Sequence, residues 1–401
     1  MSAHPHDGAG YGPAVWADLV RAVHTAPVAA VLELAGGTQG LAWLHAVGGS
    51  SATVLEAHDR YHHDSLATAL RARPARATDP AVAHELAAAA CDRARELAGA
   101  GAAVVGLGCT TAMVTGRARR GAHVCHVATR DGLGSRRVTV RLTKGARTRA
   151  QEEAVAGRLV LLALAAAAGV DPAAVPPWPE PEPLKVSVDA GSELAALLGT
   201  GARAVCRETD GSVLPDPPGD RRSRVGALLS GAFNPVHDGH RGLAAAAAAF
   251  LRLPVSYELP VVNADKSPLD AGEAHRRAAQ FLGRAELWLT RAALYADKAA
   301  LFPGAVFVVG ADTAERVLQP RFYGGERQMM DAVAAIGAAG CRFLVAARPL
   351  PSGLLTLGRL RVPDALRPLF FELPADRFCL ERSSTGIRDE LAARTRGSGA
   401  V

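Results

Sequence analysis

The second half of the chain alternates short apolar runs with longer stretches of mixed polarity. Five apolar runs have the length of buried strands: 225–229, 255–262, 286–290, 305–310 and 341–347. The stretches between them are long enough for helices, so the pattern predicts parallel βαβ units. We therefore expect an α/β domain with a doubly wound parallel sheet in residues 223–401. Ligands of such sheets bind beyond the carboxyl ends of the strands.

The first half mixes strand-like and helix-like segments in a different order. Its apolar runs favour strands at 28–34, 51–57, 103–108, 123–129 and 137–143. Helical patterns begin near Val15, after a capping Asp79 that is followed by Pro80, and near Arg147. This mixture predicts an α/β sandwich in residues 13–170. We expect the preceding residues, 1–12, to form a mobile tail.

A proline-rich stretch marks the boundary between the halves. Residues 171–183 contain six prolines in thirteen positions, which disfavours helix and sheet and favours an extended spacer. Beyond it, a short helical pattern at 193–198 and an apolar run at 202–206 precede the second domain. We interpret residues 171–222 as a linker and connecting segment.

Composition narrows the class of protein. The 401 residues are 49% hydrophobic and 21% charged, which is typical of a globular chain. The net charge of +6 suits anionic small molecules, and the sequence has no basic stripe interleaved with aromatics, so we expect no nucleic-acid partner. Six scattered cysteines, no signal pattern and no apolar run long enough for a bilayer predict a cytoplasmic protein without membrane contact.

The stretch 226–240 carries the clearest chemistry. An apolar strand leads into a turn that contains Gly231, Asn234 and Pro235, and a helix begins near His240. Glycine lets the backbone approach a ligand, and a helix N-terminus attracts phosphate. His237 and His240 can donate hydrogen bonds to phosphate oxygens, although a histidine pair is often only solvated or a satisfied core group. Their place after a strand and turn favours a phosphate site.

The motif N-P-x-H-x-G-H at 234–240 resembles the signature of the nucleotidyltransferase superfamily, which includes the nicotinamide mononucleotide adenylyltransferases. The resemblance implies a Rossmann-like domain of the nucleotidyltransferase type. It also implies catalytic roles for His237 and His240. The nucleotide-binding residues implied along the turn are Ser230, Gly231, Ala232, Phe233, Asn234 and Gly239.

Two further motifs in this half resemble the same superfamily. Gly310-Ala-Asp312-Thr resembles its G-A-D-T turn, although Asp312 can equally cap the following helix. Residues 381–388 resemble its I-S-S-T-x-I-R motif, with an arginine where isoleucine is usual, and imply a catalytic Arg388 that binds phosphate. A loop lysine, Lys266, can contact substrate phosphate or be merely solvated. The hydroxyl residues implied to bind nucleotide are Ser383, Ser384 and Thr385.

The first half resembles the C-terminal domain of CinA, whose relatives include nicotinamide-nucleotide amidases. The matching pieces are 32–37, 48–52, 106–110 and the last helix of that half. Glu33 stands where the family has its nucleophilic serine, and the segment after Tyr61 lacks the expected lysine. A serine nucleophile activated by an amine cannot operate without either group. We therefore expect a non-hydrolytic domain that serves for binding or for homo-oligomer formation.

These resemblances imply an enzyme that transfers AMP from ATP, with Mg²⁺, to nicotinamide or nicotinate mononucleotide and releases pyrophosphate. Positioning and charge neutralisation dominate such chemistry. Its partners would be small-molecule nucleotides, and no protein-bound metal is expected. Two alternatives remain open. A different nucleotide or phosphorylated acceptor, as in cytidylyl transfer or phosphopantetheine chemistry, would use the same histidine turn. A pyridine-nucleotide or ATP sensor would bind without turnover.

Overall fold

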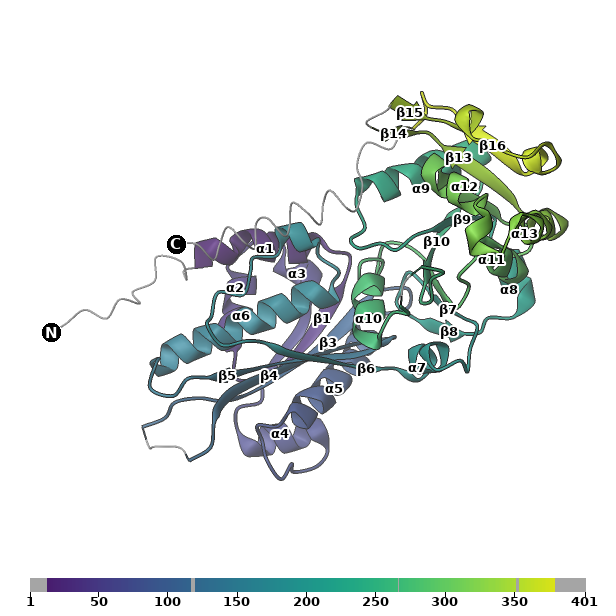
Figure 1. Ribbon diagram of the computed structural model, residues 1–401. Coiled ribbons are helices and arrows are strands. Elements are labelled where there is room, and N and C mark those ends of the chain that lie inside the picture. The colour runs from purple at the N-terminus through teal and green to yellow at the C-terminus, as the bar shows by residue number, and fades with distance from the viewer. Residues whose placement is uncertain (1–12, 117–119, 266, 351–352, 379–401) are drawn as a thin grey trace. The chain divides into compact units, whose positions relative to one another are not determined.

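The computed structural model describes residues 13–116, 120–265, 267–350 and 353–378, and they form two compact units (Figure 1). The first unit runs to Ser192 and also includes 209–212 and 279–284; the second comprises the other residues. Both contain a mixed sheet with helices, so the protein belongs to the α/β class. Among the described residues, no helix is long and apolar enough to cross a membrane.

The first unit is an α/β sandwich. Its sheet has the strand order β2-β1-β3-β4-β5-β6, in which β1 pairs in parallel with β2 and β3 and the other pairs are antiparallel. The elements are α1 (Pro13–Thr25), β1 (Ala29–Ala35), α2 (Thr38–His45), α3 (Ser50–Thr53), β2 (Val54–Asp59), α4 (His63–Leu70), α5 (Pro80–Ala98), β3 (Val104–Ala112), β4 (His123–Asp131), β5 (Gly134–Leu142), α6 (Arg149–Ala167) and β6 (Lys185–Ala190).

Helices cover both faces of this sheet, with α5 on one face and α6 on the other (Figure 1). The helix α5 packs against β3 so closely that a Cβ on Gly106 would lie 2.1 Å from the Ala87 carbonyl oxygen. Asp79 caps α5 by accepting the Ala81 N–H at 2.9 Å, as its sequence predicts. On the opposite face, apolar residues of α1 and α6 pack with the strands in the main core of the unit.

The second unit contains a sheet with the order β16-β13-β12-β9-β10-β11-β7-β8. Its strands from β16 to β11 are parallel, and β7 and β8 add an antiparallel edge. The strands and helices are α7 (Ser192–Leu198), β7 (Ala204–Arg207), β8 (Val213–Pro215), α8 (Gly219–Ser223), β9 (Ala227–Ser230), α9 (Asp238–Leu251), β10 (Val255–Pro260), α10 (Ala271–Ala279), β11 (Leu287–Thr290), α11 (Tyr295–Leu301), β12 (Val306–Gly310), α12 (Ala311–Val317), α13 (Glu326–Ala338), β13 (Arg342–Ala346), β14 (Arg348–Leu350), β15 (Gly353–Leu355) and β16 (Phe370–Leu373).

The parallel part of this sheet is Rossmann-like. Counted from β9, its strands follow the order 3-2-1-4-5-6, so the chain reverses direction across the sheet between β9 and β12. A crevice forms at such a switch point, beyond the carboxyl ends of the strands. The predicted doubly wound sheet is therefore present, and its first strand is the one that precedes the histidine turn.

Two parts of the sequence-based description differ from the structure. Residues 51–57, expected to be a strand, begin with the helical turn α3, and β2 starts only at Val54. Gly49 precedes this turn with a φ of 107°, a conformation that favours glycine and redirects the chain. The connecting segment 171–222 also supplies two strands that were not expected: β6 pairs with β5 in the first sheet, and β8 pairs with β7 in the second. β7 itself overlaps the apolar run at 202–206.

Candidate functional site

The histidine turn links β9 to α9 at the switch point of the second sheet. β9 ends at Ser230, and the chain turns through Gly231, where a Cβ would lie 2.8 Å from the Phe233 ring. Phe233 is fully buried with a φ of 45°. His237 is the N-cap of α9, and its carbonyl accepts the His240 N–H at 2.9 Å. The turn is thus packed around one aromatic side chain and ends in the first turn of a helix.

The two imidazoles lie against each other. Their ring centroids are 3.9 Å apart, and the Phe233 ring contacts the His240 ring edge-on at 5.1 Å. Nδ1 of His240 accepts the backbone N–H of His237 at 3.3 Å, so in the neutral ring the proton is on Nε2. Burial lowers the pKa of His240 to about 3, and the nearby His237, Arg241 and Arg348 act in the same direction. At neutral pH, His240 is a neutral hydrogen-bond donor through Nε2.

Arg348 connects this turn with the one that follows β12. Its guanidinium is 3.0 Å from Oδ2 of Asp312 and close enough to His240 to lower that pKa. The other carboxylate oxygen of Asp312 is buried and has no hydrogen-bond partner among the described residues. The sequence motif singled out Gly310 and Asp312, and it did not single out Arg348, which contacts Asp312. The arginine lies in β14, which forms a short hairpin with β15. No apolar run in the sequence predicted this hairpin.

Two arginines of α10 brace the histidine turn from the side. Arg276 donates to Oδ1 of Asn234 at 2.6 Å, and Arg277 donates to the Ala232 carbonyl at 3.0 Å. Glu273 accepts from both guanidinium groups, and these hydrogen bonds, that of Arg276 first, lower the pKa of Glu273 to about 2. The predicted residues Ala232 and Asn234 therefore have a visible role within the protein, since they fix the turn to a neighbouring helix.

A pocket of about 260 Å³ lies beside the turn. Ser230, Gly231 and Ala232 form one wall, Pro260 contributes from the end of β10, and Thr313 contributes from the first turn of α12, which directly follows β12. Three aromatic side chains, Tyr295, Phe322 and Tyr323, also line it, together with Asn263, Asp265 and Arg316. The pocket therefore lies at the carboxyl ends of the parallel strands, where the sequence predicted a ligand.

A buried ion pair lies at the edge of this pocket. Glu258 of β10 is fully buried, and Nζ of Lys298 lies 2.8 and 2.9 Å from its two carboxylate oxygens. Lys298 also donates to the Ala292 carbonyl at 2.8 Å, which engages its third proton. The hydroxyls of Ser230 and Thr290 donate to the same carboxylate. The pair thus joins three neighbouring strands and α11, and neither residue was singled out from the sequence.

Several predicted site residues lie outside the described residues. They are Lys266, Ser383, Ser384, Thr385 and Arg388. Gly239 lies in the first turn of α9, next to the imidazoles. The roles implied for these residues stay predictions.

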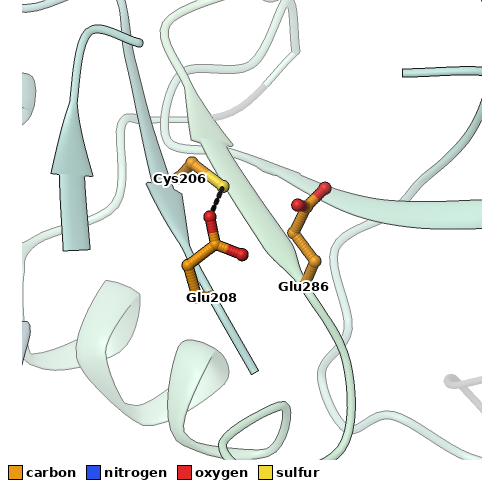
Figure 2. Close-up of side chains that lie close together, drawn as sticks. All are labelled: Cys206, Glu208 and Glu286. Atoms are coloured by element: carbon orange, nitrogen blue, oxygen red, sulfur yellow. Dashed lines mark hydrogen bonds between the residues drawn. The ribbon is translucent and has the colours of Figure 1, made fainter. Parts of the chain in front are cut away.

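A second cluster of metal-ligand types occurs on the antiparallel side of the same sheet. Cys206, Glu208 and Glu286 place a thiol and two carboxylates within 4.8 Å of one another (Figure 2). The Arg221 guanidinium already contacts both carboxylates, at 3.2 Å for Glu286. Burial raises the pKa of the Cys206 thiol to about 12, so the thiol stays protonated. The arginine therefore neutralises the two carboxylates in place of a metal cation, and the cluster does not have the character of a metal centre.

In the first unit, the position expected for a nucleophilic serine holds a paired carboxylate. Glu33 is only 4% exposed, and its carboxylate lies 2.6 Å from Nε of Arg60 and 3.0 Å from Nδ1 of His58. The N-terminus of α2 follows directly after Gly36 and Gly37. There the carboxylate of Glu153 accepts the Thr38 hydroxyl at 3.0 Å and the Gln39 N–H at 3.4 Å. Two carboxylates of the protein therefore lie at this turn: Glu33 on the strand and Glu153 at the helix N-terminus.

The fold thus defines an α/β protein whose second unit is Rossmann-like. No protein-family model and no curated protein match the sequence. The competence/damage inducible protein CihA from Agrobacterium tumefaciens matches with 21% identity and a TM-score of 0.30, over 40% of this chain and 95% of that chain. A competence-damaged protein (CinA) superfamily protein from Escherichia coli matches with 14% identity and a TM-score of 0.30, over 41% and 92%. These likenesses assign no activity.

Proposed function

We propose that the protein is a nucleotidyltransferase that moves AMP from ATP to nicotinamide or nicotinate mononucleotide and releases pyrophosphate. The observation that carries the proposal is the close pair of imidazoles, His237 and His240. It stands at the start of α9, beyond the first strand of a sheet with the order 3-2-1-4-5-6. This is where such sheets bind nucleotides, and the helix N-terminus favours phosphate.

The chemistry requires positioned donors rather than a covalent nucleophile. An oxygen of the acceptor phosphate attacks the α-phosphorus of ATP in line, and the bond from that phosphorus to the β-phosphate oxygen breaks as pyrophosphate leaves. A neutral His240 can donate from Nε2 to a phosphate oxygen, and Arg348 supplies positive charge nearby. Mg²⁺ enters with ATP and is held mainly by phosphate oxygens and water.

The pocket beside the turn supports a mononucleotide with a flat ring as the acceptor. Its volume of about 260 Å³ accommodates a small heteroaromatic ring, and Tyr295, Phe322 and Tyr323 offer aromatic faces for stacking. Ser230 and Gly231 belong to both the pocket and the histidine turn, so an acceptor bound there would extend toward the phosphates. The aromatic lining favours an acceptor with a ring, such as a pyridine mononucleotide, and the shared wall brings its phosphate toward the histidine turn.

For the first unit we propose a non-hydrolytic role. A buried Glu33 held by Arg60 and His58 cannot act as the missing serine nucleophile. The proposal assigns group transfer to the second unit alone.

The proposal is tested by product analysis. Purified protein is incubated with Mg-ATP and either pyridine mononucleotide, and the mixture is separated by chromatography. We expect the corresponding dinucleotide and an equimolar amount of pyrophosphate. ATP binding in a thermal-shift assay without a dinucleotide from either acceptor would contradict the proposal.

A further inference from the structure

The described charges that line the acceptor pocket are balanced within the protein. Lys298 directs its three protons to Glu258 and to the Ala292 carbonyl, at 2.8–2.9 Å, and is 2% exposed. Glu258 and Lys298 therefore cancel each other as a buried pair, with no proton of the ammonium left for a ligand. A charged group on a ligand ring gains no partner from this side of the pocket.

The second cation of the pocket, Arg316 of α12, is matched by an acidic residue on the loop after β10. Its Nη2 lies 2.6 Å from Oδ2 of Asp265, and its guanidinium lies over the Phe322 ring at 5.4 Å. Asp265, Arg316 and Phe322 all line the pocket. The rim thus presents an acceptor group and a donor group side by side, next to an aromatic face.

From this arrangement we infer that the pocket selects an acceptor whose ring carries an uncharged carboxamide over one whose ring carries a carboxylate. The inference rests on the proposed function and names the substrate of that same site. A carboxamide has both an N–H donor and a carbonyl acceptor, so it can donate to Asp265 and accept from Arg316. A carboxylate has only acceptors, and beside Asp265 it meets a like charge.

Asp265 is thus the specificity-determining residue of the acceptor pocket. Both partners of the rim pair are partly exposed, 44% for the Asp265 side chain and 57% for Arg316, so solvent screens their charges. The discrimination is accordingly modest. We expect kcat/KM for nicotinamide mononucleotide to exceed that for nicotinate mononucleotide about tenfold, which is the scale set by one mismatched polar group.

The experiment measures kcat/KM for both acceptors with saturating Mg-ATP in wild-type protein and in two variants. Asp265→Asn removes the negative charge and gives Arg316 to the ligand, and we expect it to reduce the amide preference to about twofold or less. Asp216→Asn is the matched control. Asp216 is 49% exposed and pairs with Arg222 at 3.2 Å, but it lies away from the pocket, so the preference should not change.

The outcomes separate this inference from the proposed function. An amide preference that Asp265→Asn reduces and Asp216→Asn leaves intact supports the inference. Dinucleotide formation with equal efficiency for both acceptors, or with a preference for the acid, overturns the inference and leaves the proposed function standing. A preference that survives in a folded Asp265→Asn protein overturns the role of Asp265. No dinucleotide from either acceptor overturns the proposed function, and the inference with it.

Discussion

The protein contains two turns in which a strand leads through glycine into a helix, and they differ in the side chains that lie at the helix N-terminus. In the first unit, β1 leads through Gly36 and Gly37 into α2, and the carboxylate of Glu153 accepts hydrogen bonds from the first turn of that helix. In the second unit, β9 leads through Gly231 into α9, where two imidazoles stand and Arg348 lies close by. A helix N-terminus attracts any anion, whether internal or external. We infer from the comparison that the side chains around such a turn, and not the turn itself, decide whether an external anion can bind there.

The largest expected effect concerns the buried pair that supports the second turn. Lys298→Met leaves the Glu258 carboxylate buried without its cation, so we expect the free energy of unfolding of the second unit to fall by about 3–5 kcal/mol. Arg93→Met, which removes an exposed partner of Glu56, should have a much smaller effect, because solvent screens that pair. Denaturant titrations of both variants measure the difference, and equal losses would contradict a supporting role for the pair.

A second effect is a decline in stability as the pH falls. The pKa of His240 is about 3 in the folded protein because the ring is buried among positive groups, whereas an unfolded histidine titrates near 6.5. The unfolded chain therefore binds a proton that the folded site refuses, and stability decreases as pH falls from about 6.5 toward 3. Melting temperatures of wild-type and His240→Gln protein measure this contribution. Identical pH profiles would show that His240 is not held neutral.

Loss of the brace on the histidine turn should have a smaller effect. Arg276→Ala removes the 2.6 Å hydrogen bond to Asn234, and we expect kcat for AMP transfer to fall about tenfold with little change in the KM for ATP. The surface change Arg95→Ala, in the first unit, should leave both constants unchanged. A rise in KM alone would place Arg276 in substrate binding rather than in positioning the turn.

The smallest effect is expected at the turn of the first unit. Glu153→Ala removes the carboxylate that caps α2, and we expect a loss of about 1 kcal/mol in the stability of that unit. The rate of dinucleotide formation should stay at the wild-type level. If Glu153→Ala lowered both the stability of the first unit and the rate of dinucleotide formation, the two turns would not have the separate roles assigned to them.

The sequence predicts the scaffold better than it predicts the site. Apolar runs located five of the six parallel strands of the second sheet, because buried strands leave continuous hydrophobic stretches; the edge strand β16 was not predicted. The histidine turn was visible because its residues are contiguous. Glu258 and Lys298 were not visible, because they lie forty residues apart and look like ordinary polar positions until the strands are paired. Arg348 was missed for the same reason.

The central claim is that the histidine turn performs group transfer. The most direct measurement compares the rate of dinucleotide formation in His240→Ala with that in His45→Ala, a change to an exposed histidine of the first unit that contacts Ser50. We predict that His240→Ala lowers kcat about 10²–10³-fold, the usual effect of losing one donor to a charge-bearing transition state, while His45→Ala does not alter it. Equal rates in the two variants would contradict the assignment of the site.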